Sequence, residues 1–318
     1  MIGGVFLFVL IDTESYFSYR FIARNSEEEM VVEYAVLSSP LYRHLVNEDA
    51  FAESSRHFFI AMVDGYGVAV GSDGKRVPKD VRVRAFSEAL ALMLVEEFGK
   101  NPDTSKFPEL FDCAAERIDA RFKHLIGEVD EDGCELQTLG AVVSCIAVAD
   151  GVIHLAQAGD CRLYASNDPG RGYRLLTTDH NGRDPRELAR FAALDLGHRL
   201  RFSLDRLRQP RLCWRKLDGY WTGGLAVTRG FGSWQNYQPM MTHVPEVLQF
   251  SLSEFEPGTI FALCTDGGSK IVQSLFIDMG SVGADVPMSC VMCALQAQLE
   301  KRGQNDDVTI LLFRVVPE

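Results

Sequence analysis

Apolar and polar residues follow two different periods along this chain, and each period predicts its own kind of element. Short apolar runs bounded by turn residues are typical of buried strands. Asp150 and Gly151 separate two such runs and predict a hairpin turn. Strands are predicted in this way at 58–63, 141–149, 152–158, 162–165, 260–264 and 308–316.

Other segments carry apolar residues at spacings of three and four, which is the period of an amphipathic helix. Helices are predicted at 86–98, 110–126, 186–196 and 286–301. Strand runs and paired helices interleave without strict β-α-β repeats, so the pattern favours an α+β fold in which helices cover sheets.

The first apolar run, residues 2–11, is about half as long as a membrane-spanning helix, which needs ~20 residues. We interpret it as an edge strand or a buried strand. A signal peptide is the competing interpretation, but no Lys or Arg precedes the run and no clear small-residue cleavage site follows it.

The composition is that of a globular protein with a large core, since 47% of the 318 residues are hydrophobic and 24% are charged. The formal net charge of −12 argues against binding to nucleic acid or to an anionic membrane, because both depend on clustered Lys and Arg. Residues 199–215 are locally basic. We favour a solvated face there over a surface for an acidic or phosphorylated partner.

Eight cysteines are scattered mostly through apolar stretches, which indicates reduced thiols and an intracellular protein, cytoplasmic or nuclear. Cys290 and Cys293 have the spacing of a metal or redox pair. No second Cys pair or His accompanies them, and their surroundings have helical periodicity, so we interpret them as ordinary helix residues.

Carboxylates recur in segments that lie far apart in the sequence, three of them where a strand-like run meets a turn. Such a carboxylate can be held rigidly and still face solvent. Oxygen ligands without a His cluster or a Cys framework suit Mg²⁺ or Mn²⁺. The segments are Asn47-Glu48-Asp49-Ala50, Asp64-Gly65-Tyr66-Gly67, Thr265-Asp266-Gly267-Gly268 and Asn305-Asp306-Asp307-Val308.

The order of these segments resembles that of the metal-dependent protein phosphatases, the protein phosphatase 2C family. A single Asp-Gly pair is usually only a turn, whereas an ordered set between about residues 44 and 315 is far more specific. Further motifs similar to those of the family are Leu139-Gly140-Ala141-Val142-Val143, Ala158-Gly159-Asp160-Cys161-Arg162, Thr177-Thr178-Asp179-His180 and Gly224-Leu225-Ala226-Val227-Thr228-Arg229-Gly230-Phe231-Gly232.

The resemblance implies a single domain over residues 1–318, with 1–43 as a divergent N-terminal part. Its fold would be an α-β-β-α sandwich, with two central antiparallel sheets flanked by helices and the metals at one end. The implied activity is hydrolysis of phosphoserine or phosphothreonine in a protein substrate. Two Mg²⁺ or Mn²⁺ ions would activate a water molecule for this reaction, and no protein nucleophile is required.

The resemblance also implies roles for individual residues. Asp64 would bridge the two ions, while Asp266 and Asp306 complete the shell of the first. Glu48 and the main-chain carbonyl of Gly65 would serve the second, and the four carboxylates are therefore the expected catalytic residues. Behind the ligands, Asp49 would orient a metal-bound water and Asp307 would support the site, while Asp160 is a candidate ligand of a third, weaker ion.

Two departures from the family pattern affect substrate binding. His44 occupies the position of the family's phosphate-binding Arg. An imidazole lacks the planar fork of donors with which a guanidinium binds phosphate. Arg43, one place earlier, is the candidate substitute. Tyr66 stands where many eukaryotic members have a His, a plausible general acid.

A third departure affects the third ion. Lys270 stands where the family usually has an Asp, and its ammonium would repel a third cation and pair with Asp160 or Asp266, unless it points to solvent. Two hypotheses follow. We expect an active phosphatase, because a chain that binds no metal has little reason to keep grouped carboxylates. The alternative is a pseudophosphatase that binds a protein partner or a phosphorylated ligand.

Overall fold

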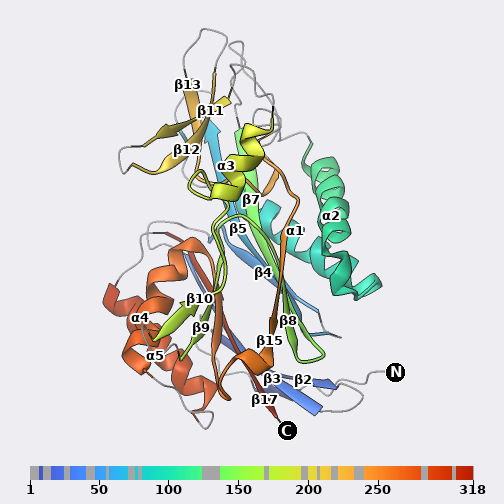
Figure 1. Cartoon of the computed structure of the whole chain (residues 1–318), viewed down its shortest axis with the longest axis vertical. Helices are drawn as coiled ribbons and strands as arrows, with labels where there is room; N and C mark the ends of the chain where they lie inside the picture. Colours follow the sequence, from blue (N-terminus) through green and yellow to red (C-terminus); the bar gives the residue numbers. More distant parts are fainter. Residues whose placement is uncertain are drawn as a thin grey trace.

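Two antiparallel sheets lie face to face in the middle of the protein, with helices on both outer sides (Figure 1). The computed structural model describes residues 7–9, 16–24, 29–40, 47–54, 57–70, 76–77, 81–123, 137–167, 172–194, 200–205, 208–215, 221–232, 240–280, 286–302 and 306–317.

The first sheet combines strands from the two ends of the chain. Its strands are β1 (Leu7–Val9), β2 (Tyr16–Arg24), β3 (Glu29–Ser39), β9 (Arg162–Ser166), β10 (Tyr173–Leu175), β16 (Phe261–Cys264) and β17 (Val308–Pro317). They follow the order β1-β2-β3-β17-β16-β9-β10. Because β17 pairs with β3 on one side and with β16 on the other, the last strand is central to this sheet.

The second sheet is built around a long antiparallel meander. Its strands are β4 (Ala50–Glu53), β5 (Phe59–Val70), β6 (Arg76–Val77), β7 (Gln137–Ala149), β8 (Val152–Ala158), β14 (Phe231–Gly232) and β15 (Glu246–Ser251). The main order is β15-β8-β7-β5-β4, with β14 on β7 and β6 on β5. Asp150 and Gly151, both at positive φ, make the predicted turn between β7 and β8.

Helices cover the outer face of each sheet, as Figure 1 shows. They are α1 (Val81–Lys100) and α2 (Phe107–Phe122) on the second sheet, and α4 (Ser269–Met279) and α5 (Met288–Arg302) on the first. Short 3₁₀ turns are η1 (Thr104–Lys106), η2 (Leu252–Glu254) and η3 (Asp266–Gly268).

Strand alternation explains how one strand contributes to two cores. On β7, Val143 and Cys145 pack toward the helices, while Ile146 lies in the core between the sheets. Aromatic side chains fill that inter-sheet core: the rings of Phe261 and Phe313 stack with centroids 5.1 Å apart. The predicted α-β-β-α sandwich is confirmed.

A smaller unit lies at one end of the sandwich, at the top of Figure 1. It contains α3 (Pro185–Ala192) and a three-stranded sheet, β11 (Leu200–Leu204), β12 (Pro210–Arg215) and β13 (Trp221–Leu225). The Asp184 side chain caps α3 by accepting a hydrogen bond from the Arg186 amide. Phe191 of α3 contacts Phe202 of β11, with ring centroids 5.1 Å apart, so the small sheet rests on this helix.

Most predicted elements are present with shifted ends. The helix expected at 186–196 is α3 and ends at Ala192, and the helix expected at 110–126 is α2 and begins at Phe107. The run 2–11 contains β1, as the strand interpretation requires. Helix α4 and strands β2, β3, β4, β6 and β10 to β15 were not predicted. Among the described helices, none is both long and apolar enough to cross a membrane.

Candidate metal centre

Carboxylates from four separate segments come together where strands of the two sheets end. Asp64 lies within β5, and Asp266 begins η3, two residues after the end of β16. Glu48 directly precedes the Asp49 that leads into β4, and Asp306 lies two residues before β17. A fifth segment, the turn between β8 and β9, adds Asp160.

Asp64 lies at the centre of this group. Burial raises the pKa of its carboxyl well above the usual value, and the charges of Asp49, Asp266, Asp160 and Asp306 raise it further. These interactions require that the five side chains lie close together. The structure therefore brings the predicted bridging residue next to two predicted ligands, the candidate third-ion ligand and Asp49.

The other carboxyl groups show the same crowding. Burial raises the pKa of Asp160 to about 7, with the charge of Asp266 as the next cause. Burial also raises the pKa of Asp49 to about 7, although the Thr265 hydroxyl acts in the opposite direction. The pKa of Asp266 is raised by burial and by Asp306.

Hydrogen bonds connect the loops that carry these residues. The Glu48 amide donates to Asp307 Oδ2 at 2.8 Å, and the Thr265 hydroxyl donates to Asp49 Oδ2 at 2.9 Å. The Asp307 amide in turn donates to Asp306 Oδ1 at 2.9 Å. Asp49 and Asp307 thus brace the loops around the group, which is compatible with the supporting roles predicted for them.

Two glycines allow the loops to approach closely. A Cβ on Gly65 would lie 2.7 Å from the Glu48 carbonyl oxygen and would also collide with Ser87 of α1. A Cβ on Gly267 would collide with the Asp307 carbonyl. Each of these Asp-Gly pairs therefore lies where two segments are in close contact. A glycine is needed there because of the neighbouring segment, and not only because of a local turn.

Two arginines near the group were not identified from the sequence. Arg84 of α1 donates from Nη1 to the carbonyls of Asn47 and Asp49, and so fixes the loop before β4. Arg162 of β9 makes a double hydrogen bond to Asp179 at 2.8 and 2.6 Å. Its charge also acts on Asp160 and on Asp266. The sequence gives no signal of such a role for Arg84, one turn into a helix. Arg162 is the last residue of the motif 158–162, but the sequence analysis gave it no role of its own.

The residues that depart from the family pattern differ in what the structure shows of them. Arg43 and His44 lie outside the described residues. Lys270 is exposed, and no ion pair joins it to a carboxylate among the described residues, which agrees with the alternative in which it points to solvent. The cation that faces those carboxylates is Arg162. Tyr66 leans over Gly140, where a Cβ would lie 2.6 Å from the phenol oxygen.

As the described side chains stand, no group of three or more His, Cys, Asp or Glu is arranged to hold a metal ion. The chemistry of the donors nevertheless fits a hard divalent cation. The gathered groups are carboxylates, and their pKa values are raised in part by mutual repulsion. A cation among them would offset that repulsion. Asp64, Asp266 and Asp306 are among the carboxylates that repel one another in this way, and the loop of Glu48 is joined to them through Asp307.

Comparisons with known proteins agree with this architecture. Among solved structures, the catalytic domain of the serine/threonine protein phosphatase PstP, in complex with two manganese ions, is similar at 16% identity, over 90% of this chain and 99% of that chain, with a TM-score of 0.53. A serine/threonine phosphatase from S. agalactiae is similar at 16% identity, over 90% of this chain and 100% of that chain, with a TM-score of 0.57. Phosphatase 2C from Toxoplasma gondii is similar at 14% identity, over 98% of this chain and 99% of that chain, with a TM-score of 0.56.

Identities this low establish a shared fold alone. Comparison with curated proteins finds no match. The model of the family Protein phosphatase 2C matches residues 99–272, which is more than half of the 318 residues. The chain therefore belongs to the protein phosphatase 2C family.

Proposed function

We propose that the protein is a Mg²⁺- or Mn²⁺-dependent phosphatase that hydrolyses phosphoserine and phosphothreonine monoesters in proteins. The observation that carries this proposal is the position of Asp64, half-buried and surrounded by four other acidic side chains from distant segments. Glu48, Asp64, Asp266, Asp306 and the carbonyl of Gly65 would hold two ions. The similarity to PstP, solved with two manganese ions, supports the choice of metal.

Two such ions, when bound, would lower the pKa of a water molecule and offset the negative charge of a phosphate monoester. The protein groups give this chemistry a fixed frame. The Thr265 hydroxyl holds the Asp49 carboxylate, and the Asp307 carboxylate holds the Glu48 amide. Preorganised groups of this kind do not need to rearrange during the reaction.

A cysteine-based phosphatase mechanism is disfavoured at this centre. Cys161 and Cys264 are the buried thiols on which its carboxylates act. Burial raises the pKa of both thiols, and Asp64 raises that of Cys161 further, so neither is a ready thiolate nucleophile. Every described cysteine is a free thiol, which supports the proposal of an intracellular protein, cytoplasmic or nuclear.

Two features bear on substrate and metal number. The proposed partner is a phosphorylated protein segment, and Arg43 remains the candidate for its phosphate group. Lys270 leaves the third position without the acidic residue usual in the family, so we propose two ions, with Asp160 as a weak additional ligand.

The second candidate function is that of a pseudophosphatase that binds a partner or a phosphorylated ligand. The specific observation in its favour is that, in the described part of the chain, no three His, Cys, Asp or Glu side chains are arranged around a common point that could hold a metal ion. A protein whose carboxylates bind no cation would keep the fold but would not hydrolyse phosphate monoesters by this mechanism.

Hydrolysis of a phosphothreonine peptide by the purified protein would decide between these functions. We expect turnover in Mn²⁺ or Mg²⁺, none in EDTA, and a loss of at least about 100-fold in Asp266→Ala. A folded protein that shows no turnover at millimolar metal, but retains specific binding of the phosphopeptide, would establish the pseudophosphatase instead.

A further inference from the structure

The turn that carries Asp160 is tightly packed against its neighbours. Gly159 has φ +132, a conformation that other residues rarely adopt, and a Cβ there would collide with Val142 of β7. Asp160 lies near Asp64 and Asp266, since its charge acts on the carboxyl of Asp64 and the charge of Asp266 acts on its own. A small displacement of the turn therefore moves Asp160 relative to the carboxylate group.

A buried histidine holds this turn from behind. The His180 side chain is 0% exposed, and its Nδ1 accepts a hydrogen bond from the Gly159 amide at 3.1 Å. The His180 amide returns a bond to the Gly159 carbonyl at 3.0 Å. Gln157 Nε2 donates to the same carbonyl at 3.0 Å and to that of Cys161 at 2.9 Å. The backbone on both sides of Asp160 is thus fixed by side chains.

The partners of the imidazole define its protonation pattern. Because Nδ1 accepts from a backbone amide, the ring proton lies on Nε2. Nε2 is 3.1 Å from Glu246 Oε2 and donates to it. Glu246 is held in turn by Arg186, whose guanidinium also binds Asp184. A carboxylate that orients a histidine is common in catalytic sites, but here the free nitrogen is directed at a backbone amide.

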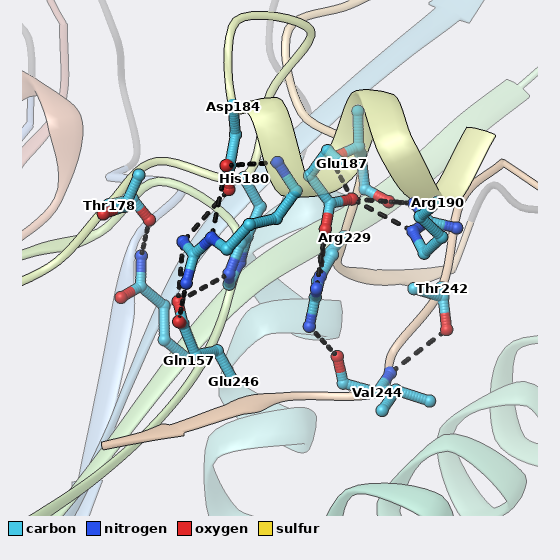
Figure 2. Close-up of polar contacts among 12 residues, drawn as sticks. Gln157, Thr178, His180, Asp184, Glu187, Arg190, Arg229, Thr242, Val244 and Glu246 are labelled. Carbon is cyan, nitrogen blue, oxygen red and sulfur yellow. Dashed lines mark hydrogen bonds and ion pairs between the residues drawn. The ribbon is translucent and has the colours of Figure 1, made fainter. Parts of the chain in front are cut away.

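Helix α3 supports the histidine from its other side. The Thr228 amide donates to the His180 carbonyl at 2.9 Å, and its hydroxyl donates to Glu187 Oε2 at 2.8 Å. Glu187 is 0% exposed and pairs with both Arg190 and Arg229 (Figure 2). A continuous series of hydrogen bonds therefore runs from Glu187 through Thr228 and His180 to the turn beside Asp160.

We propose that His180 is a positioning residue that holds the Gly159–Asp160 turn against the carboxylate group, with Glu246 fixing its tautomer and α3 bracing it. The inference rests on the proposed function, since it concerns the orientation of a metal ligand. It adds a role for a residue that touches neither metal nor substrate. Its effect must therefore pass through Asp160.

A double-mutant cycle tests that route directly. Mn²⁺ binding is titrated calorimetrically, without substrate, in the full-length protein, His180→Ala, Asp160→Ala and the double variant. We expect His180→Ala to weaken Mn²⁺ binding about tenfold, and to have no further effect once Asp160 is absent. His180→Asn, which retains an acceptor near the position of Nδ1, should restore most of the affinity.

Two controls separate positioning from general damage. His154→Ala removes a half-buried histidine on β8 that does not contact the turn, and should leave Mn²⁺ affinity unchanged. Hydrogen exchange of the 158–162 peptide should accelerate in His180→Ala and not in His154→Ala. If His180→Ala fails to fold, Glu246→Ala replaces it in the same cycle, with an expected weakening of about threefold.

The outcomes distinguish this inference from the function on which it rests. Additive effects of the two substitutions, or unchanged affinity in His180→Ala, would overturn the positioning role while leaving the metal centre intact. A protein that binds no Mn²⁺ at all would contradict both, and phosphopeptide binding would then identify the pseudophosphatase.

Discussion

At the scale of single residues, the proposed centre combines two costs that ordinary packing avoids. Acidic side chains lie close together at positions that are partly removed from water, and glycines bring the backbones of separate segments into contact. Both features oppose stability in the metal-free protein. Residues retained at such a cost are more readily explained by a ligand than by the fold.

Gly65→Ala tests the close approach at the site. The new Cβ would lie 2.7 Å from the Glu48 carbonyl oxygen and from Val83 Cγ1. We therefore expect the free energy of unfolding to fall by about 2–3 kcal/mol. Gly99→Ala is the matched control, because a Cβ there meets nothing within 4 Å and Ala favours the helix by up to about 1 kcal/mol. Chemical denaturation of both variants measures the difference. Equal stability of the two would show that the loops around Gly65 yield easily.

Asp160→Asn tests the cost of the buried charge. Because the pKa of Asp160 in the folded protein is raised to about 7, ionisation destabilises the fold as pH rises from the unfolded value near 3.8 to about 7. We expect the metal-free variant to be more stable than the parent by about 1–3 kcal/mol at pH 8, and equally stable near pH 4. Thermal melts in EDTA at both pH values measure this. A variant that is less stable than the parent at pH 8 would contradict it.

At the scale of elements, the sequence predicted what depends on local periodicity. The apolar runs that became β7 and β8 and the Asp150-Gly151 turn were recognisable because strand alternation and turn chemistry are local. The Asp64 and Asp266 segments were recognisable for the same reason. Their spatial grouping came from the family resemblance.

The elements missed by sequence analysis depend on distant contacts. β2 and β3 carry charged residues such as Arg20 and Glu33 opposite each other, and their apolar pattern alone did not identify them. Strands β11 and β12 of the small sheet lie in the arginine-rich stretch 199–215, which was interpreted as a solvated face. Arg84 was missed because its partners, the carbonyls of the loop before β4, lie more than thirty residues away in sequence.

Glu187→Gln tests the buried ionic cluster of α3. Despite burial, the two arginines and the Thr228 hydroxyl lower the pKa of Glu187 to about 2, so its charge stabilises the fold above pH 4.5, and that stability is lost as pH falls toward 2. We expect Glu187→Gln to lower the free energy of unfolding by about 3 kcal/mol at pH 7 and by less at pH 3. Urea denaturation at both pH values measures this, with the exposed Glu116→Gln as control. A loss of the same size at both pH values would exclude a charge effect.

At the scale of the whole molecule, the sandwich explains how four segments meet. β17 lies between β3 and β16, which brings Asp306 beside Asp266. β5 and β7 in the other sheet present Asp64 from the opposite side. Neither sheet alone contains the full set of carboxylates, so the centre exists only when the two sheets are packed together.

Metal binding should therefore stabilise the molecule as a unit. A ligand that binds only the folded state adds about 2.7 kcal/mol at a concentration of 100 times Kd, which for a chain of this length raises Tm by roughly 5 °C. We expect this increase on adding Mn²⁺ to the EDTA-treated protein, with both sheets melting in one transition. In Asp64→Asn most of this increase in Tm should be lost, because Asp64 is the carboxylate on which the charges of acidic residues from all the other segments act. An equal increase in Asp64→Asn would mean that Mn²⁺ binds elsewhere, and the proposed centre would then be wrong.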